Sequence, residues 1–257
     1  MEGVGVAGNS SRPGVTVVSR ALAVLAAFDE DHRRLSLTEL ARRADLPVPT
    51  AHRLVGELTA HGALARTASG DYVVGRRLWS LGLLAPVETG IREVASPFLQ
   101  DLYAATLATV HLAVREGAQV LYLDRLSGRR SVPVVSTIGS RLPLYSTGVG
   151  KVLLAYAPEH LRDEVLSSMK RITPHTITQP ARLRAQLDRV PVDGYATTAE
   201  EMTLGACSVA VPIRRHDAEV VAALGIVVPS LRRDRPRLVA ALQVAAHGIG
   251  RSISGGA

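Results

Sequence analysis

The sequence predicts an α+β fold of two domains, a small helical domain at the N-terminal end and a larger domain with a largely antiparallel sheet. Residues 36–75 have the pattern of a helix, a sharp turn, a second helix and two short strands. From residue 110, strand-like runs follow in the order hairpin, helices, hairpin, helix. A chain of 257 residues is long enough to bury two hydrophobic cores.

The first helix of this N-terminal pattern begins with a capping box, Ser36-Leu-Thr-Glu39. The Ser36 hydroxyl accepts a hydrogen bond from an amide of the first turn, and the Glu39 carboxylate accepts one from the Ser36 amide, so a helix is predicted from Leu37. Two prolines between residues 45 and 49 then end this helix. Its buried stripe is expected to consist of Leu37, Leu40, Ala41 and Ala44.

The second helix is predicted to begin near Pro49, because the fixed φ of proline suits a first helical position. His61-Gly62 supplies a C-terminal stop, and Leu54, Val55 and Leu58 supply the core side. Residues 63–66 and 71–74, joined by a turn at 67–70, predict a two-stranded wing. The whole segment therefore has the outline of a winged helix-turn-helix.

The start of the second helix has side chains suited to DNA. Close approach to a duplex requires small or hydroxyl residues, and an arginine can bind a guanine edge or a phosphate through two hydrogen bonds. Residues 32–77 also hold eight arginines against four acids, although solvated helix faces account for part of that excess. Two short helices can also match this outline by chance. The candidate DNA-binding residues are Arg33, Ser36, Pro49, Thr50, Ala51, His52, Arg53, Arg66 and Ser69.

The other elements follow from periodicity. A helix is predicted at 16–28, with Val17, Val18, Ala21, Leu22, Leu25 and Phe28 as its apolar residues, and helices are predicted at 76–84, 91–106, 151–156, 158–169, 180–190 and 236–252. Strands are predicted at 110–115, 119–126, 132–136, 195–198, 206–213 and 220–228. Pro86 is expected to mark the domain junction, and Trp79 to be structural or buried in a dimer.

Composition narrows the class of protein. The apolar fraction of 47% excludes a disordered chain, and no apolar run approaches the ~20 residues that span a bilayer. The first residues contain no apolar run of a secretory signal, and a single cysteine, Cys207, allows no intrachain disulfide. We therefore expect a cytoplasmic protein without a membrane partner. The net charge of +7 favours an anionic partner.

Motifs of catalysis are absent from the sequence. Residues 145–152 fail the phosphate-loop pattern at both ends, where Tyr145 replaces a glycine and Val152 a hydroxyl residue. No serine-hydrolase motif or zinc-ligand spacing occurs, Cys207 is expected to be a packed thiol, and Glu200-Glu201 a solvated turn. We predict no catalytic residue, no metal, no cofactor and no enzymatic activity.

Three motifs resemble the IclR family of bacterial transcriptional regulators. Residues 46–54 (LPVPTAHRL) are similar to the start of the family's recognition helix. Residues 139–155 (GSRLPLYSTGVGKVLLA) are similar to its signature G-x-x-x-P-L-x-x-T-A-x-G-K-A-x-L-A. Residues 194–201 (GYATTAEE), followed by Gly205 and the strand at 209–213, resemble its G-Y-A-x-D-x-E-E block. The likeness extends from Val15 to about Ser252.

This resemblance implies a winged helix-turn-helix joined by a linker helix to a GAF-like α+β effector domain, in dimers that often pair into tetramers. The expected divisions are a flexible tail at 1–14, the DNA-binding domain at 15–76, the linker helix at 77–97, and the effector-binding and oligomerisation domain at 98–255. By position, the expected effector-binding residues are Leu123, Arg141, Gly148, Val149, Thr198, Ser208, Gly225 and Val227.

Departures from the family pattern shape the expected ligand. Thr198 stands where members often have Asp, Ser208 where some have Cys, and Gly225 and Val227 where some have hydroxyl residues. Such a pocket has lost charge, so we expect a larger or more apolar effector than a tiny polar acid, for example an aromatic acid, with Arg141 as a candidate partner for its carboxylate. In the recognition helix, Val48-Pro49 replaces a frequent Lys-Ser, which removes a contact to DNA.

Three functions are considered for a sequence of this kind. The leading one is a sequence-specific DNA-binding regulator, in which a small-molecule effector biases the arrangement of a homodimer or homotetramer on its double-stranded DNA operator. The alternative is a DNA-binding protein whose C-terminal domain is only an oligomerisation module. The third, an enzyme with a nucleic-acid-binding appendage, is disfavoured by the missing catalytic motifs.

Overall fold

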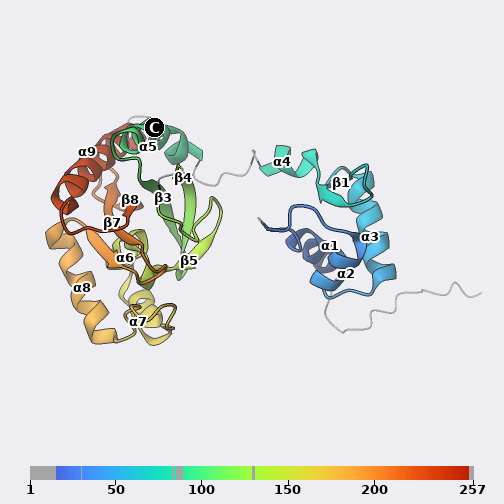
Figure 1. Cartoon of the computed structure of the whole chain (residues 1–257), viewed down its shortest axis with the longest axis horizontal. Helices are drawn as coiled ribbons and strands as arrows, with labels where there is room; N and C mark the ends of the chain where they lie inside the picture. The colour runs from blue at the N-terminus through green and yellow to red at the C-terminus, as the bar shows by residue number, and fades with distance from the viewer. Residues whose placement is uncertain (1–15, 30, 83, 85–88, 129–130, 255–257) are drawn as a thin grey trace, which may run out of the picture. The chain divides into compact units, whose positions relative to one another are not determined.

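The structure is a computed structural model that describes residues 16–29, 31–82, 84, 89–128 and 131–254. The chain divides into two units, Met1–Val87 and Glu88–Ala257, shown in Figure 1 from blue to red along the chain. The predicted tail at 1–14 and the predicted junction at Pro86 lie outside the described residues.

The N-terminal unit has the predicted helix-turn-helix and wing. Its elements are α1 (Val17–Ala26), α2 (Leu37–Arg43), α3 (Val48–Ala60), β1 (Leu64–Arg66) and β2 (Tyr72–Val74). The capping box is present, with the Ser36 amide donating to Glu39 Oε2 at 2.8 Å. β1 and β2 pair antiparallel, with Leu64 opposite Val74. The core joins Val24 of α1 to Leu40, Leu54 and Val55.

The predicted apolar stripe of α1 is partly wrong. Val17, Val18 and Leu22 are 59%, 67% and 58% exposed, whereas the core takes Val24 and Ala27. The helix carries apolar residues on more than one side, so spacing alone did not select the side that packs on α2 and α3.

The predicted linker helix at 77–97 is not one described helix. α4 (Arg76–Gly82) ends within the N-terminal unit, and α5 (Thr89–Thr106) starts within the C-terminal unit. Ile91 and Ala95 of α5 are buried in the C-terminal core, so that domain begins about ten residues before the predicted boundary at 98. Trp79 on α4 is 65% exposed in the single chain.

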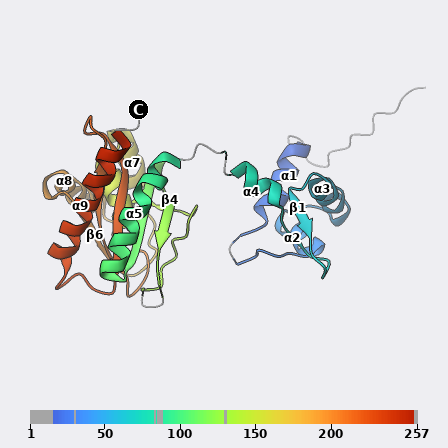
Figure 2. The same cartoon turned by 90° about the horizontal axis from the view of Figure 1, so that it is seen from above.

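The C-terminal unit contains a sheet that, within the described residues, has six strands in the order β5-β4-β3-β8-β7-β6, all paired antiparallel. Figure 2 labels β4 and β6 of this sheet. The strands are β3 (Thr109–Glu116), β4 (Gln119–Leu126), β5 (Arg141–Pro143), β6 (Ala196–Ala199), β7 (Cys207–Arg214) and β8 (Val220–Val228). The α+β class with an antiparallel sheet is thus confirmed. The strand predicted at 132–136 is wrong, because these residues form a loop beside the sheet and β5 pairs with β4 instead.

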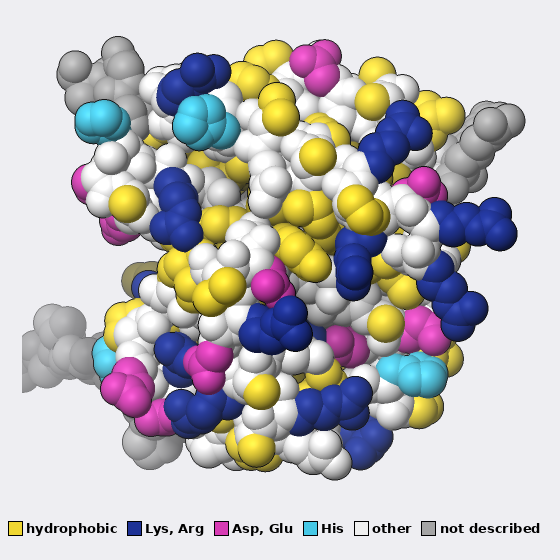
Figure 3. Space-filling view, turned by 90° about the vertical axis from the view of Figure 1, so that its left-hand side faces the viewer, with side chains coloured by type: hydrophobic (Ala, Val, Ile, Leu, Met, Phe, Trp, Pro, Cys, Tyr) yellow, Lys and Arg dark blue, Asp and Glu magenta, His cyan; other side chains and the backbone are white. Residues whose placement is uncertain are grey.

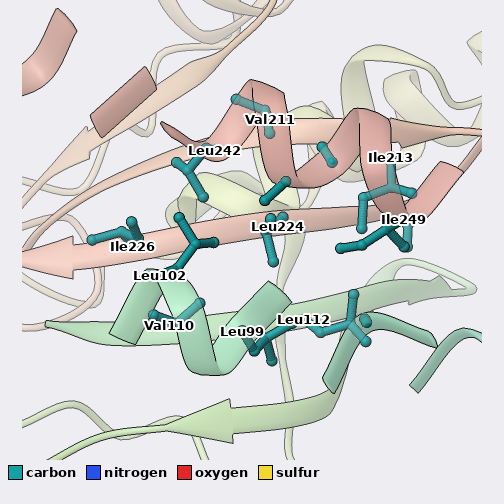
Figure 4. Close-up of a cluster of buried hydrophobic side chains, with 14 of the residues drawn as sticks. Leu99, Leu102, Val110, Leu112, Val211, Ile213, Leu224, Ile226, Leu242 and Ile249 are labelled. Atoms are coloured by element: carbon teal, nitrogen blue, oxygen red, sulfur yellow. The ribbon is translucent and has the colours of Figure 1, made fainter. Parts of the chain in front are cut away.

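Helices cover both faces of this sheet. α5 and α9 (Arg235–Ser254) pack on one face, where residues such as Leu99, Leu112, Leu224 and Leu242 form the larger core (Figure 4). On the other face lie α6 (Gly148–Ala155), α7 (Glu159–Ser167) and α8 (Pro180–Asp193), and a short 3-10 turn, Leu144–Ser146, leads into α6. Neighbouring residues of a strand face opposite sides of the sheet, so only every second residue can face the side that carries α6.

Charge is not concentrated on the face of the C-terminal unit shown in Figure 3. Lys and Arg side chains are spread over that face among acidic and hydrophobic ones. The described residues contain no helix with the length and apolarity of a membrane span.

Candidate functional site

The N-terminal end of α3 presents most of its predicted DNA-binding residues to solvent. Pro49, His52 and Arg53 are exposed, and Thr50 is half-buried. Arg53 makes no ion pair with the residues that the structure describes. Ala51 is a correction: it is fully buried, because it lies three and four positions before Leu54 and Val55 and shares their core-facing side.

The remaining predicted DNA-binding residues have local roles. The Ser36 hydroxyl is engaged in the capping box, where it accepts from the Glu39 amide at 3.3 Å and donates to the Glu39 carboxylate at 2.8 Å. Arg66 is exposed on the wing and donates from Nε to the Gly70 carbonyl at 3.2 Å. Ser69 is exposed at the wing turn, and Arg33 is exposed before α2.

The C-terminal unit has a half-open cavity between the sheet and the start of α6. Its volume is about 50 Å³. Strands β3, β4, β6, β7 and β8, the loop before β5 and the loop before β7 all contribute to its wall. Its lining includes His111, Tyr122, Ser136, Gly148, Val149, Thr198, Met202, Ser208, Gly225 and Val227.

Glycine at two positions allows α6 to approach the sheet closely. A Cβ atom on Gly148 would lie 2.5 Å from Ser208 Oγ, and one on Gly225 would lie 2.8 Å from Val149 Cγ1. The Thr147 hydroxyl caps α6 by accepting from the Gly150 amide at 3.1 Å, which leaves the Gly148 and Val149 amides at the first two helical positions. These amides and the helix dipole favour an anion at this end of the cavity.

Polar side chains lie at two places in the wall. Thr198 Oγ1 and Ser208 Oγ form a hydrogen bond of 2.6 Å between β6 and β7. His111 on β3 is hydrogen-bonded through Nε2 to Ser136 Oγ at 2.8 Å and meets the Tyr122 ring edge-on at 4.9 Å. Burial lowers the pKa of His111 to about 3, with Arg125 adding a smaller effect, and burial raises the pKa of Tyr122.

Two predicted effector-binding residues are outside this cavity. Leu123 follows Tyr122 on β4 and therefore faces the opposite core, packed with α5 and α9. Arg141 is 50% exposed, forms an ion pair with Glu116 of β3 and does not line the cavity. Both are corrections to the predicted site.

Four of the lining residues named above were not predicted from the sequence: His111, Tyr122, Ser136 and Met202. His111 and Tyr122 lie in strands that are otherwise mostly apolar. A polar residue on the same face of a strand as small residues was the signal that could have predicted their place in a cavity wall. Met202 lies in the 200–206 loop, and its sulfur accepts from Ser146 Oγ at 3.4 Å.

Glu201 overturns the prediction of a solvated turn at residues 200–201. Its side chain is buried and its Oε1 lies 2.6 Å from Nζ of the buried Lys151. Lys151 Nζ also donates to Gln186 Oε1 at 2.8 Å, and the Thr176 hydroxyl donates to the Glu201 carbonyl at 2.8 Å. This buried ion pair ties α6 to the loop that carries Met202. Cys207, by contrast, is half-buried on β7.

Acid should destabilise the C-terminal domain through His111. In the unfolded chain the His111 imidazole binds a proton below its ordinary pKa of 6.5, whereas in the folded chain its pKa is about 3. The folded pKa is the lower one, so stability falls with decreasing pH through this window, by about 1.4 kcal/mol per pH unit. Urea unfolding of wild type and His111→Phe at pH 7.5 and 5.0 measures this: the wild type should lose about 2 kcal/mol more than the variant. An equal loss in both proteins would contradict it.

Family models divide the chain as the structure does. The IclR helix-turn-helix domain model matches residues 17–68, and the model of the bacterial transcriptional regulator IclR C-terminal domain matches residues 85–254. Among the described residues, no group of three or more His, Cys, Asp or Glu side chains could hold a metal ion.

Known relatives are similar over nearly their full length. The HTH-type transcriptional regulator XynR of Escherichia coli is 31% identical over 229 residues, covering 88% of this chain and 91% of XynR. The glycerol operon regulatory protein of Streptomyces coelicolor is 32% identical over 245 residues, covering 93% and 96%. These relatives are transcriptional regulators and not enzymes, which confirms the prediction that the chain is not an enzyme.

Solved structures share the fold. An IclR homolog of Microbacterium hydrocarbonoxydans complexed with 4-hydroxybenzoate has a TM-score of 0.88 and 34% identity, covering 93% of this chain and 100% of that one. IclR of Thermotoga maritima has a TM-score of 0.78 and 30% identity, covering 92% and 98%. This chain therefore belongs to the IclR family of transcriptional regulators, with a helix-turn-helix domain that binds DNA and a C-terminal domain that binds an effector.

Proposed function

We propose that this regulator binds its operator through the start of α3 and the wing, and that an aromatic acid in the cavity beside α6 alters that binding. The observation that carries the proposal is the position of the Gly148 and Val149 amides at one end of a cavity whose exposed wall is mostly apolar. Amides at a helix start bind a carboxylate well, and an apolar wall favours a ring over a small polar acid.

The size of the cavity bears on the proposed ligand. About 50 Å³ is roughly a third of the ~150 Å³ cavity that holds benzene in another protein. An aromatic acid therefore requires the wall to open, and Met202 is the flexible side chain best placed to move. Such opening would move the 200–206 loop, which gives the ligand a way to change the conformation of its domain.

Calorimetric titration tests the proposed ligand class. Benzoate and 4-hydroxybenzoate should bind to the full-length protein, and glyoxylate should bind more weakly, because Thr198, Ser208, Gly225 and Val227 leave few groups to hold a small polar acid. The related structure complexed with 4-hydroxybenzoate supports the choice of ligands. Preference for glyoxylate would exclude an aromatic effector. If none of these acids binds, the alternative of a purely oligomerising C-terminal domain gains support.

Arg53 is proposed to read the operator. Its side chain is exposed near the start of α3, beside His52 and Pro49, where a recognition helix contacts base edges. Arg53→Ala should weaken operator binding by about 1–3 kcal/mol and relax sequence preference if Arg53 binds a base. Fluorescence anisotropy with the operator and a scrambled duplex measures both effects. The matched control is Arg189→Ala on α8, which removes the same charge and should leave operator affinity unchanged.

We also propose a homodimer, with a tetramer as its further assembly, acting in the cytoplasm where the chromosome is. Exposed apolar side chains in the N-terminal unit support self-association: Val17, Val18, Leu22, Trp79 and Leu81. Light scattering of the full chain tests the state, and a monomer at micromolar concentration would exclude it.

A further inference from the structure

A groove that the proposed function does not use crosses the edge of the sheet at β6, the last strand in the sheet order among the described residues. This β6 groove has a volume of about 790 Å³, within the ~300–1,000 Å³ typical of small-molecule sites. As far as the described residues show, it shares only Thr198 with the cavity beside α6, and it includes neither Gly148 nor Val149. The groove is therefore a second place where a ligand can bind. Its charged lining residues are His175, Arg182, Glu200, Glu201, Arg232 and Arg235.

The arginines of the β6 groove have exposed side chains, and none of them pairs with a carboxylate of the described residues: Arg182, Arg232 and Arg235. Other arginines of α8 do have such a partner. Arg184 lies 2.6 Å from Asp163, and Arg189 lies 3.2 Å from Asp193. Three forked hydrogen-bond donors of the same charge are thus gathered in one concave surface with their N–H groups open to a ligand.

The carboxylates of the β6 groove are held by other groups. Glu201 Oε1 lies 2.6 Å from Nζ of the buried Lys151, so this pair carries no net charge. Glu200 accepts a hydrogen bond from the Gly205 amide at 2.6 Å, and its other oxygen lies 3.6 Å from His175 Nε2. The three arginine charges therefore exceed the one remaining carboxylate charge, that of Glu200, by two.

Two of these arginines stand where the helix dipole disfavours a cation. Arg182 belongs to the first turn of α8 and Arg235 is the first residue of α9, and neither first turn contains an acidic residue. The start of a helix carries a partial positive charge, so it favours an anion. Burial is the main reason why the pKa of Lys151 is lowered, and the nearby charge of Arg182 lowers it further. An anion in the groove would offset this concentration of positive charge.

A phosphate group fits these residues better than a single carboxylate does. A guanidinium binds phosphate through two parallel hydrogen bonds, and a phosphate ester carries about −1.5 to −2 charges at pH 7, which matches the excess of two. We propose that the β6 groove is a second ligand site, which binds a small phosphorylated compound through Arg182, Arg232 and Arg235. This inference goes beyond the proposed function and does not depend on an aromatic effector.

The test is calorimetric titration of the full-length protein with inorganic phosphate and with pyrophosphate, at one fixed ionic strength because salt screens exposed charges. Pyrophosphate should bind at least about 10-fold more tightly, because its two phosphoryl groups can contact more than one arginine. Arg182→Ala and Arg235→Ala should each weaken pyrophosphate binding at least about 10-fold. The matched control is Arg184→Ala, which removes the same charge from the same helix outside the groove and should leave pyrophosphate binding unchanged.

Three outcomes would overturn the inference. The first is that neither probe binds the wild type at millimolar concentration, and the second is that both bind equally well, since a shared site of several arginines prefers the more highly charged probe. The third is an equal loss in Arg184→Ala, which would show a general effect of surface charge. Operator affinity, measured by anisotropy, should stay at the wild-type value in a double variant of Arg182→Ala and Arg235→Ala. A loss there would assign the groove to DNA and not to a small phosphorylated compound.

Discussion

Replacing Lys151 with methionine should lower the free energy of unfolding of the C-terminal domain by about 3–5 kcal/mol. The substitution leaves the Glu201 carboxylate buried without its cation, which lay 2.6 Å away. Burial lowers the pKa of Lys151 and raises that of Glu201, so each charge depends on the other. Chemical denaturation followed by far-UV circular dichroism measures the loss.

A double variant separates the lost ion pair from lost packing. Lys151→Met with Glu201→Leu removes both charges and should recover most of the stability, because a hydrophobic pair of similar volume often replaces a buried ion pair without loss. Arg189→Ala serves as the control, since Arg189 is 76% exposed and pairs with Asp193 on the same helix, and surface pairs contribute about 0–1 kcal/mol. A Lys151→Met protein as stable as the wild type would refute the assigned role.

The same ion pair connects stability to the effector site. Glu201 precedes Met202 and Thr203, which line the cavity, and its carbonyl accepts from the Thr176 hydroxyl at 2.8 Å. Lys151 belongs to α6, whose first two amides face the proposed carboxylate. The pair therefore fixes the cavity loop relative to the helix that would hold the ligand. A Lys151→Met protein that still folds should also bind aromatic acids more weakly.

Gly148→Ala is expected to weaken aromatic-acid binding by at least about 100-fold while leaving operator affinity near normal. The added Cβ would lie 2.5 Å from Ser208 Oγ and 3.4 Å from Ser208 Cβ. Because the Ser208 hydroxyl is held by its hydrogen bond to Thr198, we expect the start of α6 to move away from β7. That movement displaces the two amides, and hydrogen bonds to a charged group contribute about 1.5–3 kcal/mol each. Operator binding depends on the other unit of the chain.

Removing the obstructing side chain should restore binding. In Gly148→Ala with Ser208→Gly, the new methyl group no longer meets Ser208 Oγ or Cβ and contacts Ala210 Cβ at an ordinary 3.6 Å, so α6 can return to its place. Calorimetry with 4-hydroxybenzoate and anisotropy with the operator measure the two affinities on the same preparations. Wild-type ligand affinity in Gly148→Ala would show that these amides do not hold the carboxylate. Loss of operator affinity as well would indicate a general folding defect.

Local signals were sufficient for most elements of this protein. The capping box at Ser36 to Glu39, the hairpin of β3 and β4 and the strand at 220–228 agree with the structure to within one residue at each end. These signals act over a few residues, through hydrogen bonds within one turn or through alternation along one strand. The strand predicted at 132–136 was wrong because a run of apolar β-branched residues suits the wall of a cavity as well as it suits a strand.

The sequence by itself determined the order of helices and strands, the two-domain division and the family, because each depends on short stretches of chain. Only the tertiary structure decided which face of each element is buried. It buried Ala51, turned Leu123 to the opposite core and paired Arg141 with Glu116. It also joined Lys151 to Glu201 and His111 to Ser136, residues 50 and 25 positions apart. Contacts across such separations depend on how the sheet and helices pack, and no local pattern encodes them.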